Sequence, residues 1–147
     1  MTNFELKYVN IDSSYYREAV TIREELFFKN IENRLDLIQD KFESTGIHLV
    51  CLKDNEVIGT GRLNIENNTG VISQMAIKPE YHKLGVGARI LIELVNYSKK
   101  NELFKVKLGA RETALTFYKK FNFVIVGERY PSKKTGVIHH QMELKID

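Results

Sequence analysis

The stretch "MAIKPEYHKLGVGARILIELVNYSKK" covers residues 75–100 and decides how the chain is organised. An apolar run ends at Pro79, a polar bend follows, and Gly85 and Gly87 stand where a segment with helical spacing of apolar residues begins. Backbone N–H groups in the first turn of a helix have no internal acceptors, and with the helix dipole they attract anions. The stretch therefore predicts a strand, a turn and a helix, with a turn suited to a phosphate. A purely steric reason for the two glycines is the alternative.

The flanking segments predict an α/β (α+β) fold in a single domain over residues 1–147, with about four helices on a central mixed, mostly antiparallel sheet of six to seven strands. Asp54-Asn55 predicts a hairpin turn, and Ser13 and Thr113 are candidate helix caps. Expected strands cover residues 4–9, 47–53, 56–66, 71–77, 104–109, 123–130 and 136–146. The expected helices cover residues 15–28, 33–43, 86–101 and 113–121.

Composition restricts the class of protein. Apolar residues make up 43% of the chain and charged residues 28%, which is typical of globular domains. No apolar run approaches the roughly 18 residues of a membrane helix, and the first ten residues lack a signal-peptide pattern, so a cytoplasmic location without a membrane partner is expected. The net charge of +3 is dispersed, which argues against a nucleic-acid partner and suits an anionic ligand. Cys51 lies in an apolar strand and is expected to be a buried, inert thiol.

Two other phosphate-binding motifs do not fit the glycine turn. A Walker loop requires Lys followed by Ser or Thr after its second glycine, and here Ala88 and Arg89 follow. A dinucleotide fingerprint requires a third glycine, where this chain has Ile90, and it lies in a parallel βαβ unit rather than after three antiparallel strands.

Two segments resemble the signatures of the GNAT superfamily of acyl-CoA-dependent N-acyltransferases. "MAIKPEYHKLGVGARIL" (75–91) is similar to motif A, V-x-P-x-x-[RQ]-x-x-G-x-[GA], although His82 replaces the Arg or Gln. "ARETALTFYKKFNF" (110–123) is similar to the second signature, A-x-x-x-A-x-x-F-Y-x-x-x-G-F, with Asn122 in place of its glycine. A narrower resemblance to the ElaA-like branch rests on "REELF" (23–27) and "GVIHHQM" (136–142).

This resemblance implies acetyl-CoA as co-substrate. No metal is expected, because His48 and His82 lack an i,i+4 partner or a cysteine. Superfamily members pair the main chain of the strand with the pantetheine arm, which implies Met75 and Ile77, and a main-chain N–H of Met75 or Ala76 as the donor to the oxyanion. The diphosphate would lie on the turn. The residues that the resemblance implies for binding acetyl-CoA, called the donor site, are Met75, Ala76, Ile77, His82, Lys83, Leu84, Gly85, Val86, Gly87 and Ala88.

The resemblance also implies that Tyr118 is the general acid that protonates the leaving thiolate. Its place on an apolar helical stripe makes core packing the alternative. The expected fourth strand carries no carboxylate, so the candidate bases are Glu112, His139 and a water chain. Alternation directs His140 toward the core and His139 to the other face, where it is either in the site or at a solvated edge.

Candidate acceptor-binding residues are Arg23 and Glu25 on the first helix and Arg62 on strand 56–66, each with a solvated surface position as the alternative. The expected function is transfer of an acetyl group to a primary amine of a small molecule or peptide, by direct attack through a tetrahedral intermediate. An acyl-CoA-binding sensor without chemistry and a nucleic-acid-binding domain are the other classes. The oligomeric state stays open, with a homodimer as one option.

Overall fold

The computed structural model describes residues 3–29, 31–32 and 34–146. The chain forms two compact units, one of residues 1–64 and 74–94 and the other of residues 65–73 and 95–147. The predicted mixed α/β class with four helices is confirmed, whereas the single domain over 1–147 stays a prediction.

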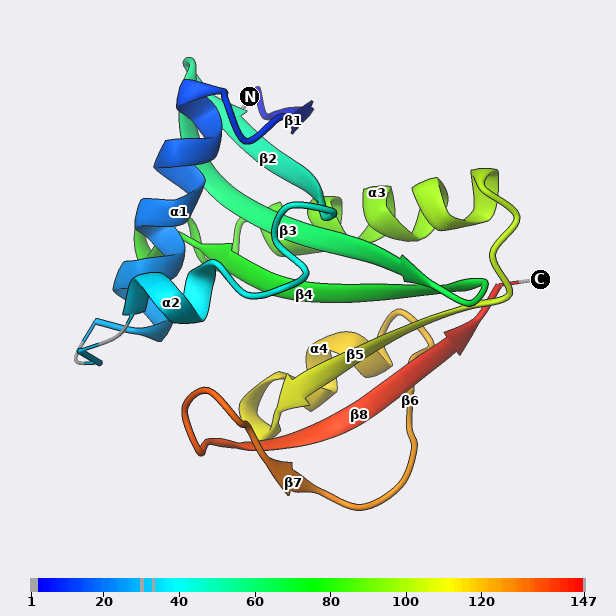
Figure 1. The fold of residues 1–147 in the computed structure, drawn as a ribbon. Coiled ribbons are helices and arrows are strands. Elements are labelled where there is room, and N and C mark those ends of the chain that lie inside the picture. The colour runs from blue at the N-terminus through cyan, green and yellow to red at the C-terminus, as the bar shows by residue number, and fades with distance from the viewer. Residues whose placement is uncertain (1–2, 30, 33, 147) are drawn as a thin grey trace. The chain divides into compact units, whose positions relative to one another are not determined.

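The first unit contains two helices, the first turns of a third, and a sheet (Figure 1). Ser13 caps α1 as the sequence predicts, because its hydroxyl accepts from the Tyr15 N–H at 3.1 Å. The predicted hairpin turn is confirmed by the left-handed φ angles of Asp54 (52°) and Asn55 (65°). The strands, in order of pairing, are β1 (Glu5–Val9), β2 (Ile47–Lys53), β3 (Glu56–Glu66) and β4 (Thr69–Ile77), and the helices are α1 (Ser14–Phe27), α2 (Arg34–Ile38) and α3 (Val86–Lys100).

A bulge in the β2–β3 pair determines which residues of β3 share a face. Leu52 pairs with Val57, but Cys51 pairs with Gly59, so Ile58 is an extra residue in the ladder. Strict alternation would put Val57 on the Gly59 face. The bulge instead turns Val57 toward α1, where it packs with Val50, Leu52, Ala19 and Ile22. Thr60 and Arg62 lie on this α1 face as well, since residues directly opposite in a ladder point the same way.

The second predicted helix is shorter than residues 33–43. It ends at Ile38, and the Asp40 carboxylate then accepts the Phe42 N–H at 3.0 Å. A side chain that bonds its own backbone two residues on competes with helical hydrogen bonding, which explains the early end.

The second unit is built on β5 and β8, which pair antiparallel from Lys105 opposite Lys145 to Arg111 opposite His139 (Figure 1). The first residues of β4 pair parallel to β5, and this register ends at Ile72 opposite Leu108. Buried Val106, Leu108, Tyr118, Phe123 and Met142 contribute to the core. The elements are β5 (Lys105–Arg111), α4 (Leu115–Lys119), β6 (Val124–Ile125), β7 (Tyr130–Pro131) and β8 (Ile138–Lys145).

Three expectations for the second unit are wrong in detail. The expected strand 123–130 is interrupted, because Gly127 takes a left-handed φ of 79°, so the sheet has eight strands rather than six to seven. Thr113 does not cap α4: residues Glu112–Ala114 form one 3-10 turn that leads into the helix. Phe104 precedes β5 and is 57% exposed, whereas the sequence pattern groups it with Val106.

Candidate active site

The turn between β4 and α3 carries main-chain N–H groups without helical acceptors. The first helical hydrogen bond of α3 runs from the Arg89 N–H to the Gly85 carbonyl at 3.0 Å, so the amides of residues 86–88 precede it and have no helical acceptor. Lys83 (φ 66°) and Gly85 (φ 83°) are left-handed, and a Cβ built on Gly85 meets no atom within 4 Å. Leu84 is 54% exposed. The turn is therefore open, as an anion site requires.

The bend before this turn is held by His82 and Pro79. The His82 Nε2–H donates to the Ile77 carbonyl at 2.9 Å, and the His82 main-chain N–H donates to the Pro79 carbonyl at 3.1 Å. The ring of His82 thus closes the end of β4 onto the loop and is itself exposed. Where motif A has an arginine or glutamine, this chain uses the histidine at least in part as a structural brace.

Two glycines in β3 bring α3 close to the strand. A Cβ at Gly61 would lie 2.8 Å from both Ile90 Cγ2 and Met75 Sδ, and one at Gly59 would lie 3.0 Å from Val86 Cγ1. Real Cβ atoms essentially never show the distances at Gly61 and rarely show the one at Gly59, so the start of α3 packs directly on the face of β3 that carries these glycines. This packing sets the position of the turn relative to β4, and the sequence analysis did not identify it.

Strand β4 is irregular at the centre. Gln74 has a φ of 57°, which is unfavourable for a residue with a side chain, and it directly precedes Met75, Ala76 and Ile77. Left-handed residues within a strand interrupt its ladder and redirect the main-chain groups that follow. The three residues that the family resemblance assigns to the thioester end of acetyl-CoA thus follow a residue with left-handed main-chain geometry.

Arg23 and Arg62 are buried, with 2% and 4% of their side chains exposed, so the alternative of a solvated surface position is wrong for both. Both bind Glu43: Arg23 Nη1 and Nη2 lie 2.7 and 3.0 Å from its two carboxylate oxygens, and Arg62 Nη1 lies 2.7 Å from one of them. Arg62 also forms a two-pronged pair with Asp40 at 3.0 and 3.2 Å. The Arg23 Nε–H donates to Gln74 Oε1 at 3.3 Å. We define these five residues as the buried ion network.

The pKa values of three groups in and around the buried ion network are shifted. Burial alone would raise the pKa of Glu43, but hydrogen bonds and charge from Arg23, with hydrogen bonds from Tyr16 and Arg62, lower it to about 2. Burial and its hydrogen bond to Glu43 raise the pKa of Tyr16. Burial lowers the pKa of His48, whose Nε2–H donates to the Glu43 carbonyl at 3.0 Å. Glu43 is therefore the ionised centre of the network at neutral pH.

Tyr118, in the second unit, is 8% exposed and lies on α4. Its ring makes edge contacts with Phe117 and Phe123, at centroid distances of 5.0 and 6.0 Å. Burial raises the pKa of its hydroxyl to about 12, so the phenol carries its proton throughout the neutral range. The packing that the sequence analysis gave as the alternative is present, and it leaves the acid role a prediction.

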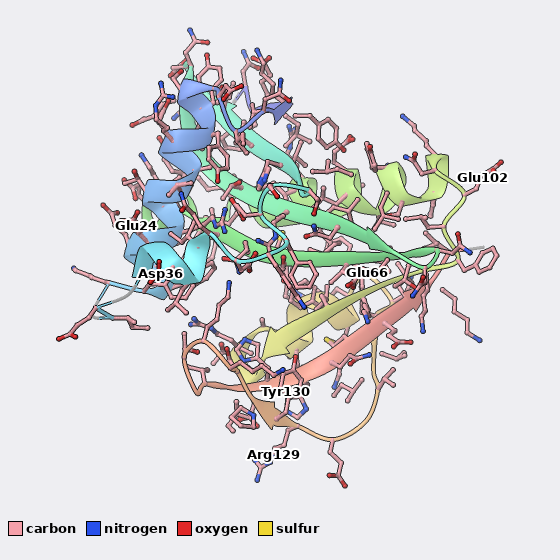
Figure 2. All side chains as sticks on the ribbon, in the orientation of Figure 1. Glu24, Asp36, Glu66, Glu102, Arg129 and Tyr130 are labelled. Atoms are coloured by element: carbon pink, nitrogen blue, oxygen red, sulfur yellow. The ribbon has the colours of Figure 1, made fainter. Side chains whose placement is uncertain are left out.

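The other candidate groups of the second unit lie on β8 and the turn before α4. The His139 Nδ1–H donates to the Val137 carbonyl at 2.8 Å, which leaves Nε2 as the lone-pair nitrogen of the neutral ring. The His139 ring stacks obliquely on Tyr130, labelled on β7 in Figure 2, at 6.1 Å. Glu112 lies 3.4 Å from His140 Nε2 and 3.6 Å from Arg129. The carboxylate thus has two cationic or hydrogen-bonding neighbours, whereas His139 keeps one nitrogen available.

A family model described as an acetyltransferase (GNAT) domain matches residues 11–146. The chain belongs to the GNAT acetyltransferase family. It is an acyltransferase, and its resemblance to the superfamily in the two signatures is confirmed.

Individual GNAT proteins resemble this chain at low identity. YjcF of Bacillus subtilis, named an uncharacterized N-acetyltransferase, is 25% identical over 126 residues, which are 86% of this chain and 89% of YjcF. The crystal structure of Escherichia coli ElaA superposes with a TM-score of 0.77 at 18% identity, covering 97% of this chain and 99% of ElaA. An aminoglycoside 6′-N-acetyltransferase complexed with coenzyme A gives 0.79 at 11% identity, covering 96% of each chain. The two structures share the fold of this GNAT chain.

The candidate residues of this GNAT chain fall into two sets. The first unit holds the donor stretch 75–88 together with Arg23, Glu25 and Arg62, and the second unit holds Tyr118, Glu112 and His139. Glu25 is exposed on α1, so a solvated position remains an adequate account of it. The acceptor-binding roles of these residues stay predictions. Residues 3–29, 31–32 and 34–146 contain no group of three or more His, Cys, Asp or Glu side chains able to hold a metal ion.

Sequence reasoning missed Glu43 and the left-handed conformation of Gln74. The one available signal was in β3, where Thr60, Arg62 and Asn64 alternate with residues of the glycine face. If the face of β3 that carries the glycines packs closely on a helix, an arginine on the opposite face is covered by another part of the protein. Such a buried arginine needs a buried carboxylate as its partner.

No helix in the described part of the chain is long and apolar enough to cross a membrane.

Proposed function

We propose that the protein transfers an acetyl group from acetyl-CoA to a primary amine of a small molecule or peptide. Transfer of an acyl group to an amine is the activity that the GNAT family suggests, and its co-substrate is acetyl-CoA. The observation that carries the proposal is the open first turn of α3 at the end of β4, with main-chain amides that have no helical acceptor. In this proposal residues 83–88 bind the diphosphate.

The chemical step is a direct attack. The neutral amine nitrogen adds to the thioester carbonyl carbon, and the carbonyl oxygen becomes an oxyanion that accepts a hydrogen bond from the Met75 or Ala76 main-chain N–H. One such donor contributes roughly 2.7–4 kcal/mol to transition-state stabilisation. The tetrahedral intermediate then collapses, the carbon–sulfur bond breaks with its electron pair on sulfur, and the nitrogen loses a proton to the base.

Tyr118 is proposed to supply the proton to the departing thiolate. Its hydroxyl has a pKa of about 12, against about 8.5 for a thiol in water, so the transfer is uphill by roughly 5 kcal/mol at 1.36 per unit. Apolar surroundings also raise the pKa of a thiol, which narrows the gap for a leaving group that departs into a desolvated site.

His139 is the better of the two side-chain candidates for the base. Its Nδ1–H is committed to the Val137 carbonyl, so Nε2 of the neutral ring can accept a proton. Glu112 is 54% exposed and already faces Arg129 and His140. A water chain remains the alternative route for the proton.

Substituting Gly87 with Glu tests the donor site. A carboxylate in the first turn of α3 repels the diphosphate, and we expect acetyl-CoA to bind about a hundredfold more weakly or worse, because like charges in an interface cost several kcal/mol. The fold should survive, since Glu has a higher helix propensity than Gly and an acidic residue suits a helix N-terminus. Titration calorimetry with acetyl-CoA measures the affinity.

Asn96→Glu is the matched control for that substitution. It adds the same charge on an exposed position of the same helix but far from its first turn, and acetyl-CoA affinity should stay within about twofold at physiological ionic strength. Equal affinities of the Gly87→Glu variant and the control would refute the phosphate turn.

Substituting Tyr118 with Phe tests the acid. We expect turnover to fall about a hundredfold, the lower end for loss of a general acid, with acetyl-CoA affinity nearly unchanged. Steady-state rates over an amine panel and calorimetry provide the two measurements. If the rate is unaffected, Tyr118 is a packing residue only. If the wild type binds acetyl-CoA but turns over no amine, the result would favour the function of an acyl-CoA-binding sensor.

A further inference from the structure

We propose that Arg23 is a positioning residue that holds the left-handed main chain of β4 at Gln74, and thereby the main-chain groups of residues 75–77. The inference rests on the proposed function for the role of those groups. It goes beyond it in assigning Arg23 a duty inside the protein rather than a contact with the acceptor. Arg23 is 2% exposed, and its Nε–H donates to Gln74 Oε1 at 3.3 Å.

The geometry of the guanidinium group explains why Arg23 can act as a brace. Its two terminal nitrogens bind the two carboxylate oxygens of Glu43 at 2.7 and 3.0 Å, and this two-pronged contact fixes the plane of the group. The direction of the Nε–H is then fixed as well, and it points at Gln74. Glu43 is itself held by the Tyr16 hydroxyl at 2.6 Å and by Arg62 at 2.7 Å. A lysine cannot reproduce this arrangement, because its ammonium has no fixed fork.

Gln74 requires an external constraint. A left-handed conformation is unfavourable for a residue with a Cβ and persists where the surrounding structure determines it. The next residues, Met75 and Ala76, carry the N–H groups proposed to contact the oxyanion. A change in the Gln74 backbone would redirect these groups, and small displacements of positioned groups have large effects on binding and rate.

The test compares Arg23→Gln with Tyr16→Phe. Both remove hydrogen bonds to Glu43, but only the first removes the bond to Gln74. We expect Arg23→Gln to speed amide hydrogen exchange of residues 74–77 and to weaken acetyl-CoA binding roughly tenfold, at a temperature where the variant is fully folded. Tyr16→Phe should lower the melting temperature and leave both readouts within about twofold of wild type. Arg23→Lys should not restore either one.

A role for Arg23 in stability alone predicts a different result. Arg23→Gln would then melt earlier, yet its exchange at residues 74–77 and its acetyl-CoA affinity would match those of Tyr16→Phe, and this outcome overturns the proposal. If Arg23→Gln does not fold, Gln74→Ala removes the same bond from the other side while keeping a Cβ at the left-handed position, and the same two outcomes apply. Should the wild type fail to bind acetyl-CoA, the proposed function fails, whereas hydrogen exchange still decides the role of Arg23.

Discussion

Substitution of Glu43 with Gln is expected to lower the free energy of unfolding by about 3–5 kcal/mol, the cost of breaking a buried ion pair from one side. The substitution keeps the volume but leaves Arg23 and Arg62, 2% and 4% exposed, without the carboxylate they share. Asp40 still faces Arg62, so Arg23 is the guanidinium that loses its carboxylate outright. Urea unfolding at pH 7, followed by circular dichroism, measures the change.

The change in the free energy of unfolding at acid pH provides a second measurement of the same substitution. The pKa of Glu43 is lowered from 4.5 to about 2 by folding, so below pH 4.5 the unfolded chain binds this proton more readily than the folded chain. The stabilisation is present above pH 4.5 and is lost as the pH falls toward 2, a change of about 3 kcal/mol. Glu43→Gln should lack this component.

The control for Glu43→Gln is Glu56→Gln, which breaks the pair of the exposed Glu56 with Lys78 at 3.2 Å. Such surface pairs contribute about 0–1 kcal/mol, so the unfolding free energy should change little. If the Glu43 variant changed as little as the Glu56 variant, the buried ion network would not be a stabilising feature.

Substitution of Gly61 with Val is expected to destabilise the first unit by about 3 kcal/mol and to reduce acetyl-CoA affinity as well. The added Cβ would lie 2.8 Å from Ile90 Cγ2 and Met75 Sδ, and overpacking of this kind costs about 1–3 kcal/mol or occasionally more. Met75 can move its flexible end, but Ile90 belongs to α3, so relief requires the start of α3 to shift from β3. Urea unfolding and calorimetry report the two effects.

Gly109→Val is the matched control in another strand. The nearest atom to a Cβ there is the Tyr130 hydroxyl, the far end of a side chain that is 40% exposed. We expect a stability change below about 1 kcal/mol. Equal losses for both variants would mean that the close approach of α3 to β3 is not what makes Gly61 necessary.

The parts of the fold that follow from local chemistry could be predicted from the sequence. Ser13 caps α1 because its hydroxyl reaches an N–H two residues on, and Asp54-Asn55 turns the hairpin because both residues tolerate left-handed angles. The strand, turn and helix around Gly85 likewise follow from the turn residues at the bend and from the helical spacing of apolar residues after it.

The parts that depend on distant partners could not be predicted. Arg62 is polar, and only the packing of α1 and of the loop holding Asp40 and Glu43 over its strand explains its burial. The bulge at Ile58 exchanges the faces of β3 without any signal in alternation. In the candidate site, the positions of Gly85 and Gly87 could be read, but the brace on Gln74 joins residues 51 positions apart. Single-sequence patterns carry no information about such pairs.

The open turn at residues 83–88 has a consequence for how the chain can diverge. Its donors are peptide N–H groups, and every residue type supplies one except proline, whose ring nitrogen has no hydrogen. Side chains along the turn can therefore vary with little loss of the anion-binding capacity itself. Proline introduced at Gly87 or Ala88 would delete a donor, whereas an exchange of the exposed Leu84 side chain would leave every donor in place.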